Sequence, residues 1–264
     1  MGKFITIAPK EPNAHSVRGG YFPLPLQRVG PSTWHNIMSA DWGVNPIDGT
    51  KLVKPTFDQV LELAGDALTD RYNHKKDGKF NPAFDPVVDA MGGVGKVLTG
   101  DTLMVVSPTK AYFVNNPNQE LRAQFGVNDQ RALEEMVSNF DKQLKRKERR
   151  TGIASAGNLA AVSVENVSQG DQSWHPMNTD YLGRNLGLIA LARSREVAES
   201  LAVGSRAYKG ESFFGLSAEA NKLVTRVPGL VLNYISDNLA VVGYRDAGDS
   251  EACSLGISPV KTGN

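Results

Sequence analysis

The chain has 264 residues and a formal net charge of +1, with 41% apolar and 22% charged residues. Such a composition is typical of a globular protein with a real hydrophobic core, and the length suits one large domain or two small ones. The near-neutral charge argues against a protein devoted to coating nucleic acid, so any such contact would be local.

Residues 1–55 differ from the rest of the chain because they hold half of its 14 prolines. Prolines at this density prevent a long helix or a central strand, yet the segment has too many aromatic residues for a disordered tail. We therefore predict an extended N-terminal arm whose apolar side chains pack into grooves, either of its own domain or of a neighbouring subunit. The anchors expected to make subunit contacts are Tyr21, Phe22, Leu24, Leu26, Trp34 and Trp42.

Two helices are predicted next. Thr56 and Gln59 form a capping-box pair before an apolar face that runs to Asn73. Asp85-Pro86 then opens a second helix, with proline at its favoured first position. The glycine-rich stretch 92–96 does not match a phosphate-binding loop, because Ala90 and Val97 stand at two of the motif's required positions.

Two pairs of short apolar runs predict β-hairpins. One joins 103–106 to 111–114 around a turn with Pro108, and the other joins 230–235 to 239–244. The stretch 101–108 is similar to strand–turn segments of phage capsid-type chains, a resemblance of eight residues that names no family.

The longest helical pattern begins at Asn128 or Asp129 and places Leu133, Met136, Val137, Phe140 and Leu144 in one stripe. Asp141 and Lys145 are spaced as an i,i+4 ion pair. Beyond Leu144 the helix becomes a cationic tip, which is either a solvated helix end or a contact to nucleic-acid backbone or an acidic partner. The contact residues would be Lys142, Lys145, Arg146, Arg149 and Arg150.

The second half of the chain continues the mixture of strands and helices. We predict a strand at 159–164, a buried strand or helix start at 186–192, and a helix at 194–208. A further helix runs from Ser217 through Thr225, stopped by Pro228-Gly229. The expected organisation is an arm at 1–55, a single α+β domain at 56–245 with a mixed sheet of short hairpins and four to five amphipathic helices, and an irregular C-terminal tail at 246–264.

The sequence contains no complete catalytic or metal-binding motif. Its four histidines form no zinc-binding spacing. Ser173, His175 and Asp180 have the atoms of a hydrolytic triad, but they are close in sequence and lack a nucleophile elbow. Cys253 is the sole cysteine and is expected to be a small buried apolar side chain. We expect no catalytic residue of recognisable motif, no metal and no cofactor.

The sequence favours a structural or assembly protein over an enzyme. Its concrete form is a bacteriophage virion component (capsid, neck or tail) whose partners are copies of itself or neighbouring structural proteins. A nucleic-acid-binding protein using 142–150 and an enzyme with a dispersed site remain the alternatives. No apolar run reaches the ~18 residues of a membrane span. The apolar start of the chain is interrupted by Pro9, Lys10 and Glu11, so we expect a cytoplasmic or virion location without a signal peptide.

Overall fold

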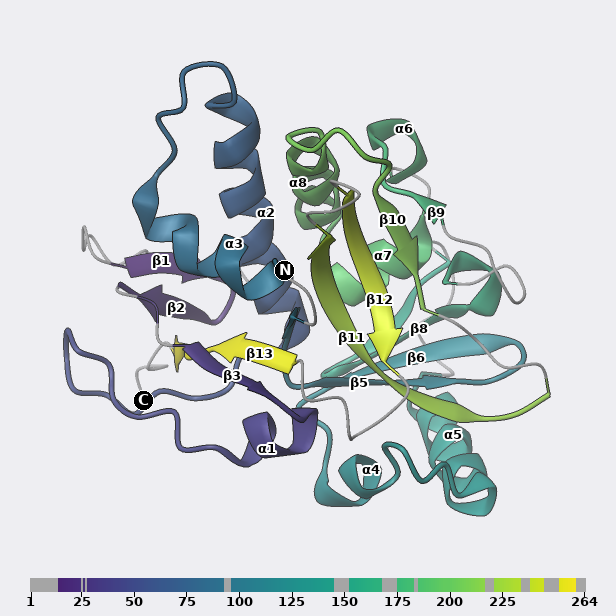
Figure 1. Cartoon of the computed structure of the whole chain (residues 1–264). Helices are drawn as coiled ribbons and strands as arrows, with labels where there is room; N and C mark the ends of the chain where they lie inside the picture. The colour runs from purple at the N-terminus through teal and green to yellow at the C-terminus, as the bar shows by residue number, and fades with distance from the viewer. Residues whose placement is uncertain are drawn as a thin grey trace, which may run out of the picture.

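The computed structural model describes residues 14–24, 26, 28–92, 96–144, 152–167, 175–182, 185–216, 221–233, 238–244 and 252–259. They form helices packed on a mixed β-sheet, which confirms the α+β class (Figure 1). No helix among these residues is both long and apolar enough to cross a membrane.

The main sheet has the strand order β3-β13-β4-β11-β5-β6-β8-β7. Its strands are β3 (Arg28–Ser32), β4 (Val97–Thr99), β5 (Thr102–Val106), β6 (Lys110–Asn115), β7 (Ala154–Ala156), β8 (Leu159–Ser163), β11 (Val224–Asn233) and β13 (Ala252–Leu255). β12 (Asn238–Tyr244) pairs with β11 and with β10 (Phe213–Gly215), which in turn pairs with β9 (His175–Pro176). A smaller sheet joins β1 (Ala14–Val17), β2 (Gly20–Pro23) and β14 (Ser258–Pro259). The pairs β13–β4 and β10–β12 are parallel.

Both faces of the main sheet are covered, and the strand sequences explain why. Successive side chains of a strand point to opposite faces. Along β5, Leu103 and Val105 join one apolar cluster, whereas Met104 and Val106 join another. The same alternation occurs in β6 and β8. Strands buried on both faces read as continuous apolar runs, which is the pattern of these segments.

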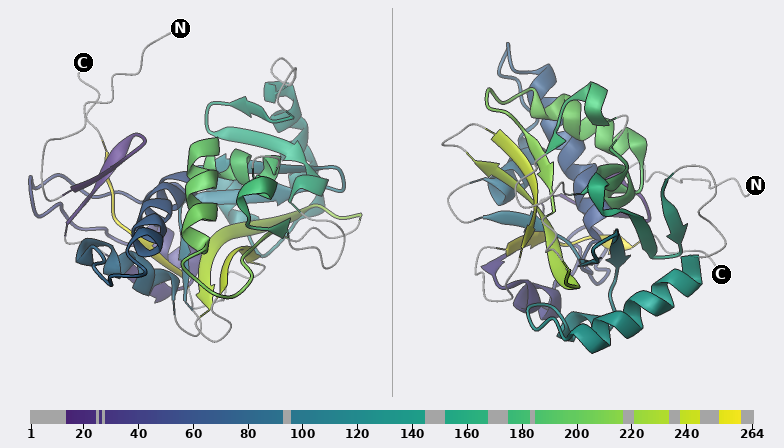
Figure 2. Two further views of the ribbon diagram at one scale, coloured as in Figure 1. Left: turned by 90° about the horizontal axis from the view of Figure 1, so that it is seen from above. Right: turned by 90° about the vertical axis from the view of Figure 1, so that its right-hand side faces the viewer.

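Helices supply the two outer layers. The helices are α1 (Trp34–Ser39), α2 (Phe57–Asn73), α3 (Asp85–Met91), α4 (Gln119–Ala123), α5 (Gln130–Leu144), α6 (Thr179–Leu182), α7 (Leu186–Ala192) and α8 (Arg195–Ser205), with single 3-10 turns at Pro82–Phe84 and Val164–Asn166. α2, α7 and α8 bury their apolar sides in the first cluster, and α1, α4 and α5 in the second. In the right-hand view of Figure 2, α5 lies on the side of the sheet opposite these first three helices.

α2 and α8 form the closest helix pair of the first layer. α2 begins with the predicted capping box of Thr56 and Gln59. Gly204 of α8 lies against α2, and a Cβ atom at this glycine would come within 2.4 Å of the Leu68 Cβ. Any larger side chain at 204 would push the two helices apart.

The helix expected near 128–150 is present as α5. Leu133, Met136 and Leu144 are buried, and Val137 and Phe140 pack partly buried against the same cluster. The carboxylate of Asp141, expected to pair within the helix, accepts hydrogen bonds from the Lys110 ammonium at 3.2 Å and the Tyr112 hydroxyl at 3.0 Å. Residues 145–150, and with them the expected Lys145 partner, lie outside the described ranges.

Both hairpins are confirmed as β5–β6 and β11–β12. The helix expected from Ser217 through Thr225 is wrong at its described end, because β11 begins at Val224 and contains Pro228 and Gly229. β11 pairs with β5 up to Arg226 and with β4 from Gly229. Pro228 falls between these two pairings, where its missing N–H interrupts neither ladder.

The segment expected as an irregular C-terminal tail contains an interior strand of the main sheet. β13 lies between β3 and β4, and all four of its residues are buried. Cys253 is fully buried, as predicted, and burial raises the pKa of its thiol. The strand is short and flanked by glycine-rich polar sequence, so its residues alone do not predict a strand. Its position depends on pairing with β3 and β4, which are remote in sequence.

Residues 14–55 pack on their own chain. They contribute β1 and β2 to the small sheet, β3 to the edge of the main sheet, and α1 to the second helical layer. Residues 1–13 of the predicted arm lie outside the residues that the structure describes. The edge position of β3 suits Pro31, because an edge strand can lack a donor on its open side.

Candidate functional site

Two arginines from distant parts of the chain meet at one cavity. The cavity has a volume of about 310 Å³ and is lined by Arg18, Ile153, Ser155, Gly157, Ala160, Ile189, Ala190 and Arg193. Arg18 lies in the turn between β1 and β2, Arg193 in the junction between α7 and α8, and residues 153–160 around the β7–β8 hairpin. We call this cavity the arginine pocket. Its volume is within the usual range for small-molecule sites.

The backbone of Arg193 is held in an uncommon conformation. α7 ends at Ala192 and Ser194 already caps α8, so Arg193 alone makes the turn between the two helices. Its φ is +52°, in the left-handed region that glycine usually occupies at this position. Residues held in such conformations often lie at functional sites, which directs attention to the Arg193 side chain.

The Arg193 guanidinium is only partly satisfied by the protein. Its Nη1 donates to the Gly157 carbonyl at 2.7 Å. Its Nη2 is buried and has no hydrogen-bond partner among the described residues. Buried polar nitrogens are nearly always hydrogen-bonded, because an unmade bond costs about 1–3 kcal/mol and more for a charged group. Nη2 is therefore a donor that the described part of the chain leaves available.

Arg18 is fixed beside Arg193 by its backbone as well as by its side chain. The backbone N–H of Arg18 donates to the Glu62 carboxylate at 3.0 Å, and its carbonyl accepts from the Gln59 amide at 2.8 Å. The Arg18 Nη1 donates to the Arg193 carbonyl at 3.0 Å. α2 thus holds the β1–β2 turn in place, and the turn carries a second guanidinium to the pocket.

The electrostatics of the pocket follow from burial and two charged neighbours of Arg193. Burial lowers the pKa of Arg193, the Asp58 carboxylate opposes this, and the nearby charge of Arg18 lowers the pKa further. Arginine remains charged through such shifts because its ordinary pKa is so high. Among the described residues Arg193 forms no salt bridge, so its charge is compensated by Asp58 only at a distance.

Asp58 is itself held by a buried chain of hydrogen bonds. Its carboxylate accepts from the Asn115 amide at 2.8 Å. The Thr102 hydroxyl donates to the Asn115 side-chain carbonyl at 2.7 Å and accepts the Phe57 backbone N–H at 2.9 Å. The first turn of α2, where Asp58 lies, also favours a negative charge. Asp58 is thereby oriented by β5, β6 and its own helix.

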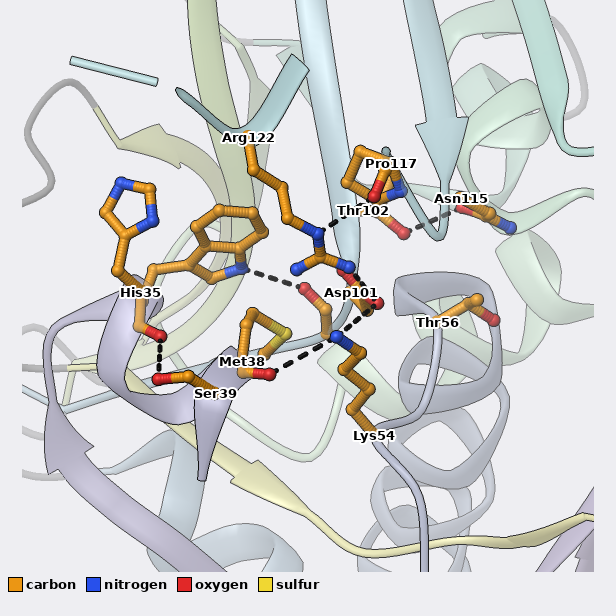
Figure 3. A network of polar contacts seen from close by, with 12 residues as sticks. His35, Met38, Ser39, Lys54, Thr56, Asp101, Thr102, Asn115, Pro117 and Arg122 are labelled. Carbon is orange, nitrogen blue, oxygen red and sulfur yellow. Dashed lines mark hydrogen bonds and ion pairs between the residues drawn. The ribbon is translucent and has the colours of Figure 1, made fainter. Parts of the chain in front are cut away.

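A second charged cluster surrounds Asp101, which directly precedes Thr102 at the other end of this series of hydrogen bonds (Figure 3). One oxygen of the fully buried Asp101 carboxylate is 2.6 Å from the Arg122 guanidinium and 3.4 Å from the Lys54 ammonium. Trp34 donates its indole N–H to the Gly100 carbonyl at 3.1 Å and lies beneath Arg122. These contacts, which we call the Asp101 clamp, tie residues 34–55 and α4 to the start of β5.

The side chains expected at a subunit interface are mostly buried within their own chain. Phe22, Leu26, Trp34 and Trp42 have exposed fractions of 0%, 8%, 3% and 7%. Leu24 packs partly buried on the first cluster, and Tyr21 donates its hydroxyl to Asp48 at 2.8 Å. These side chains are therefore buried or partly buried without a second molecule. Contact with another subunit through them stays a prediction.

The basic tip is described only at Lys142, because Lys145, Arg146, Arg149 and Arg150 lie outside the described ranges. Lys142 lines shallow surface hollows together with Glu134 and Ser138. On the same helix Arg131 lies 3.7 Å from Glu135. The described part of α5 thus carries mixed charge, and nucleic-acid binding by its tip stays a prediction.

The histidine of the incomplete triad is buried beside a tyrosine. Nδ1 of His175 is hydrogen-bonded to the Tyr181 hydroxyl, and the two rings stack. Burial lowers the pKa of His175, and a nearby backbone carbonyl of Glu165 opposes this. Ser173 lies outside the described residues, and within them no group of three or more histidine, cysteine, aspartate or glutamate side chains is arranged to hold a metal ion.

Sequence reasoning missed both arginines of the pocket. Arg18 stands in a proline- and glycine-rich stretch and Arg193 follows the apolar run 186–192, and neither belongs to a motif. The nearest signal was the run ending in Ala192-Arg193-Ser194, where a helix stop and a new cap coincide. Comparison of the chain with protein-family models, with curated proteins and with solved structures found no match.

Proposed function

We propose that this chain binds a small anionic ligand in the arginine pocket. This is the dispersed-site alternative, in which the site is assembled from residues far apart in the sequence. The observation that carries the proposal is the buried Arg193 Nη2 without a hydrogen-bond partner, in a residue that lines a cavity of about 310 Å³. Because Nη2 is buried in this conformation, an anion in the cavity would meet it after a small rotation of the Arg193 side chain, and Arg18 would supply a second cation.

The arrangement favours binding over a specific chemical reaction. Guanidinium groups recognise carboxylates and phosphates through their fixed fork of N–H donors. They are poor general acids and bases because they stay protonated. The pocket lining described above contains one hydroxyl, that of Ser155, which lies in an exposed position of β7. The proposal therefore concerns recognition of the ligand.

Titration of the protein with acetate, sulfate and phosphate, followed by NMR or calorimetry, tests the proposal. We expect saturable binding that Arg193→Gln weakens by about 10- to 100-fold, since charged hydrogen bonds contribute about 1.5–3 kcal/mol. Arg195→Gln is the matched control, because Arg195 is an exposed arginine two residues further along and does not line the pocket. Equal affinities for both variants, or no saturable binding by the unaltered protein, would refute the proposal.

Self-assembly as a virion component is a second proposal, supported by different residues from those first expected. Val44 and Val53, in the segment expected to carry subunit contacts, are exposed at 61% and 40%. If this surface joins copies of the chain, light scattering should show an oligomer that the double change Val44→Ser and Val53→Ser dissociates. Val127→Ser, at a valine exposed at 71% in the turn after α4, serves as the control. A monomer at high concentration would end this proposal.

A further inference from the structure

We infer that the ligand of the arginine pocket is a monocarboxylate with a short apolar body, an inference that rests on the proposed anion binding. Four aliphatic side chains line the cavity together with the two arginines: Ile153, Ala160, Ile189 and Ala190. A hydrated inorganic ion would gain nothing from contact with these apolar side chains. A site that combines apolar walls with a few polar groups binds an organic molecule and orients it by those groups.

The charges around the pocket favour one negative charge over two or more. The two cations, Arg18 and Arg193, are accompanied by three carboxylates. Asp58 acts on Arg193, Glu62 accepts the Arg18 backbone N–H, and the charge of Arg18 lowers the pKa of the exposed Glu196. The hydrogen bond from Ser194 is the main cause of the lowered pKa of Glu196, and Arg18 adds to it. With these carboxylates close by, a dianion or polyphosphate gains less from the arginines and is repelled more. A single carboxylate needs only those N–H donors of Arg18 and Arg193 that make no hydrogen bond within the described residues.

The guanidinium N–H donors of Arg18 and Arg193 match a single planar carboxylate group. Arg193 already donates Nη1 to Gly157, which leaves Nη2 as its buried free nitrogen. Arg18 donates Nη1 to the Arg193 carbonyl, which brings its guanidinium to the same place. Once the Arg193 side chain rotates to bring the buried Nη2 to the cavity, one carboxylate with two oxygens can accept from Nη2 and from a remaining Arg18 N–H. The apolar body would then lie on Ile189 and Ala190 of α7, which precede Arg193 in the chain.

The test is a chain-length series of acetate, butyrate and hexanoate, with inorganic phosphate and 1-hexanol as probes that lack the apolar body or the charge. Each buried methylene contributes about 0.8 kcal/mol, which is about a fourfold gain in affinity. We expect affinity to rise from acetate to hexanoate. Phosphate should bind more weakly than hexanoate, and hexanol should not bind measurably.

Variants of the pocket wall separate this inference from the proposal on which it rests. Ile153→Ala should weaken hexanoate by several-fold and leave acetate unchanged, whereas Ile47→Ala, at a half-buried isoleucine away from the pocket, should change neither. If small anions bind and Arg193→Gln abolishes the binding, but affinity is flat along the series or highest for phosphate, the proposed function stands and this inference is overturned. If no anion binds, both fail.

Discussion

The Asp101 clamp and the arginine pocket are built from the same kinds of side chain but differ in how their charges are compensated. In the clamp one oxygen of the fully buried Asp101 carboxylate lies 2.6 Å from a guanidinium and 3.4 Å from an ammonium, and the other oxygen has no hydrogen-bond partner among the described residues. In the pocket the Arg193 guanidinium donates to a neutral carbonyl and has no carboxylate in direct contact, and its buried Nη2 has no partner among the described residues. A charge that is paired with an opposite charge of the same chain holds segments together. A charge without such a partner, beside a cavity, can bind a ligand.

The two clusters are the ends of one polar layer between α2 and the sheet. Asp101 is followed directly by Thr102, whose hydroxyl leads through Asn115 to Asp58. Asp58 then acts on Arg193.

The largest expected effect on stability is that of Asp101→Asn. This change leaves Lys54 and Arg122 beside a neutral amide, and breaking a buried ion pair by removing one partner costs about 3–5 kcal/mol. Urea unfolding should show a loss of that size in the free energy of unfolding. Because residues 34–55 are held by this carboxylate, they should become the segment most exposed to proteolysis.

An exposed ion pair provides the control for the clamp. Asp85 lies 2.5 Å from Arg71, and its side chain is 52% exposed. We expect Asp85→Asn to change the free energy of unfolding by less than about 1 kcal/mol, as is usual for surface pairs. Similar losses for Asp85→Asn and Asp101→Asn would mean that the clamp does not hold the N-terminal segment.

A smaller effect is expected at Arg193, where the backbone carries strain for the sake of the side chain. Arg193→Gly and Arg193→Ala both remove the guanidinium, so the difference between them isolates the left-handed backbone at φ +52°. The glycine variant should be more stable by about 1 kcal/mol, because a Cβ atom disfavours this conformation. An alanine variant as stable as the glycine variant would show that the junction relaxes and stores no strain.

The contrast between the clusters also explains which features of the structure can be predicted from the sequence. The helix of 57–73, the stripe of α5 and both hairpins were predictable, because each depends on residues a few positions apart. The clamp and the pocket were not, because their residues are separated by up to 175 positions. Single arginines outside any motif give no sign of which remote segment they will meet.

The errors have the same origin. Pro228-Gly229 predicts a helix stop, since proline and glycine are local signals, but β11 contains both where its pairing passes from β5 to β4. The sequence after 245 predicts an irregular tail, yet β13 is a buried strand between two others. The described part of the N-terminal segment packs on its own chain, which is one of the two predicted alternatives, and its contact with a second subunit stays a prediction.

The sequence by itself determined the local periodicities of this protein, and with them its α+β class, its main helices and its hairpins. Only the tertiary structure decided that the strand near the C-terminus lies inside the sheet, where the N-terminal side chains are buried, and which two arginines share a cavity. The reason is physical: hydrogen bonding within a helix or hairpin is settled between near neighbours, whereas burial and charge compensation depend on segments that meet only when the chain has folded.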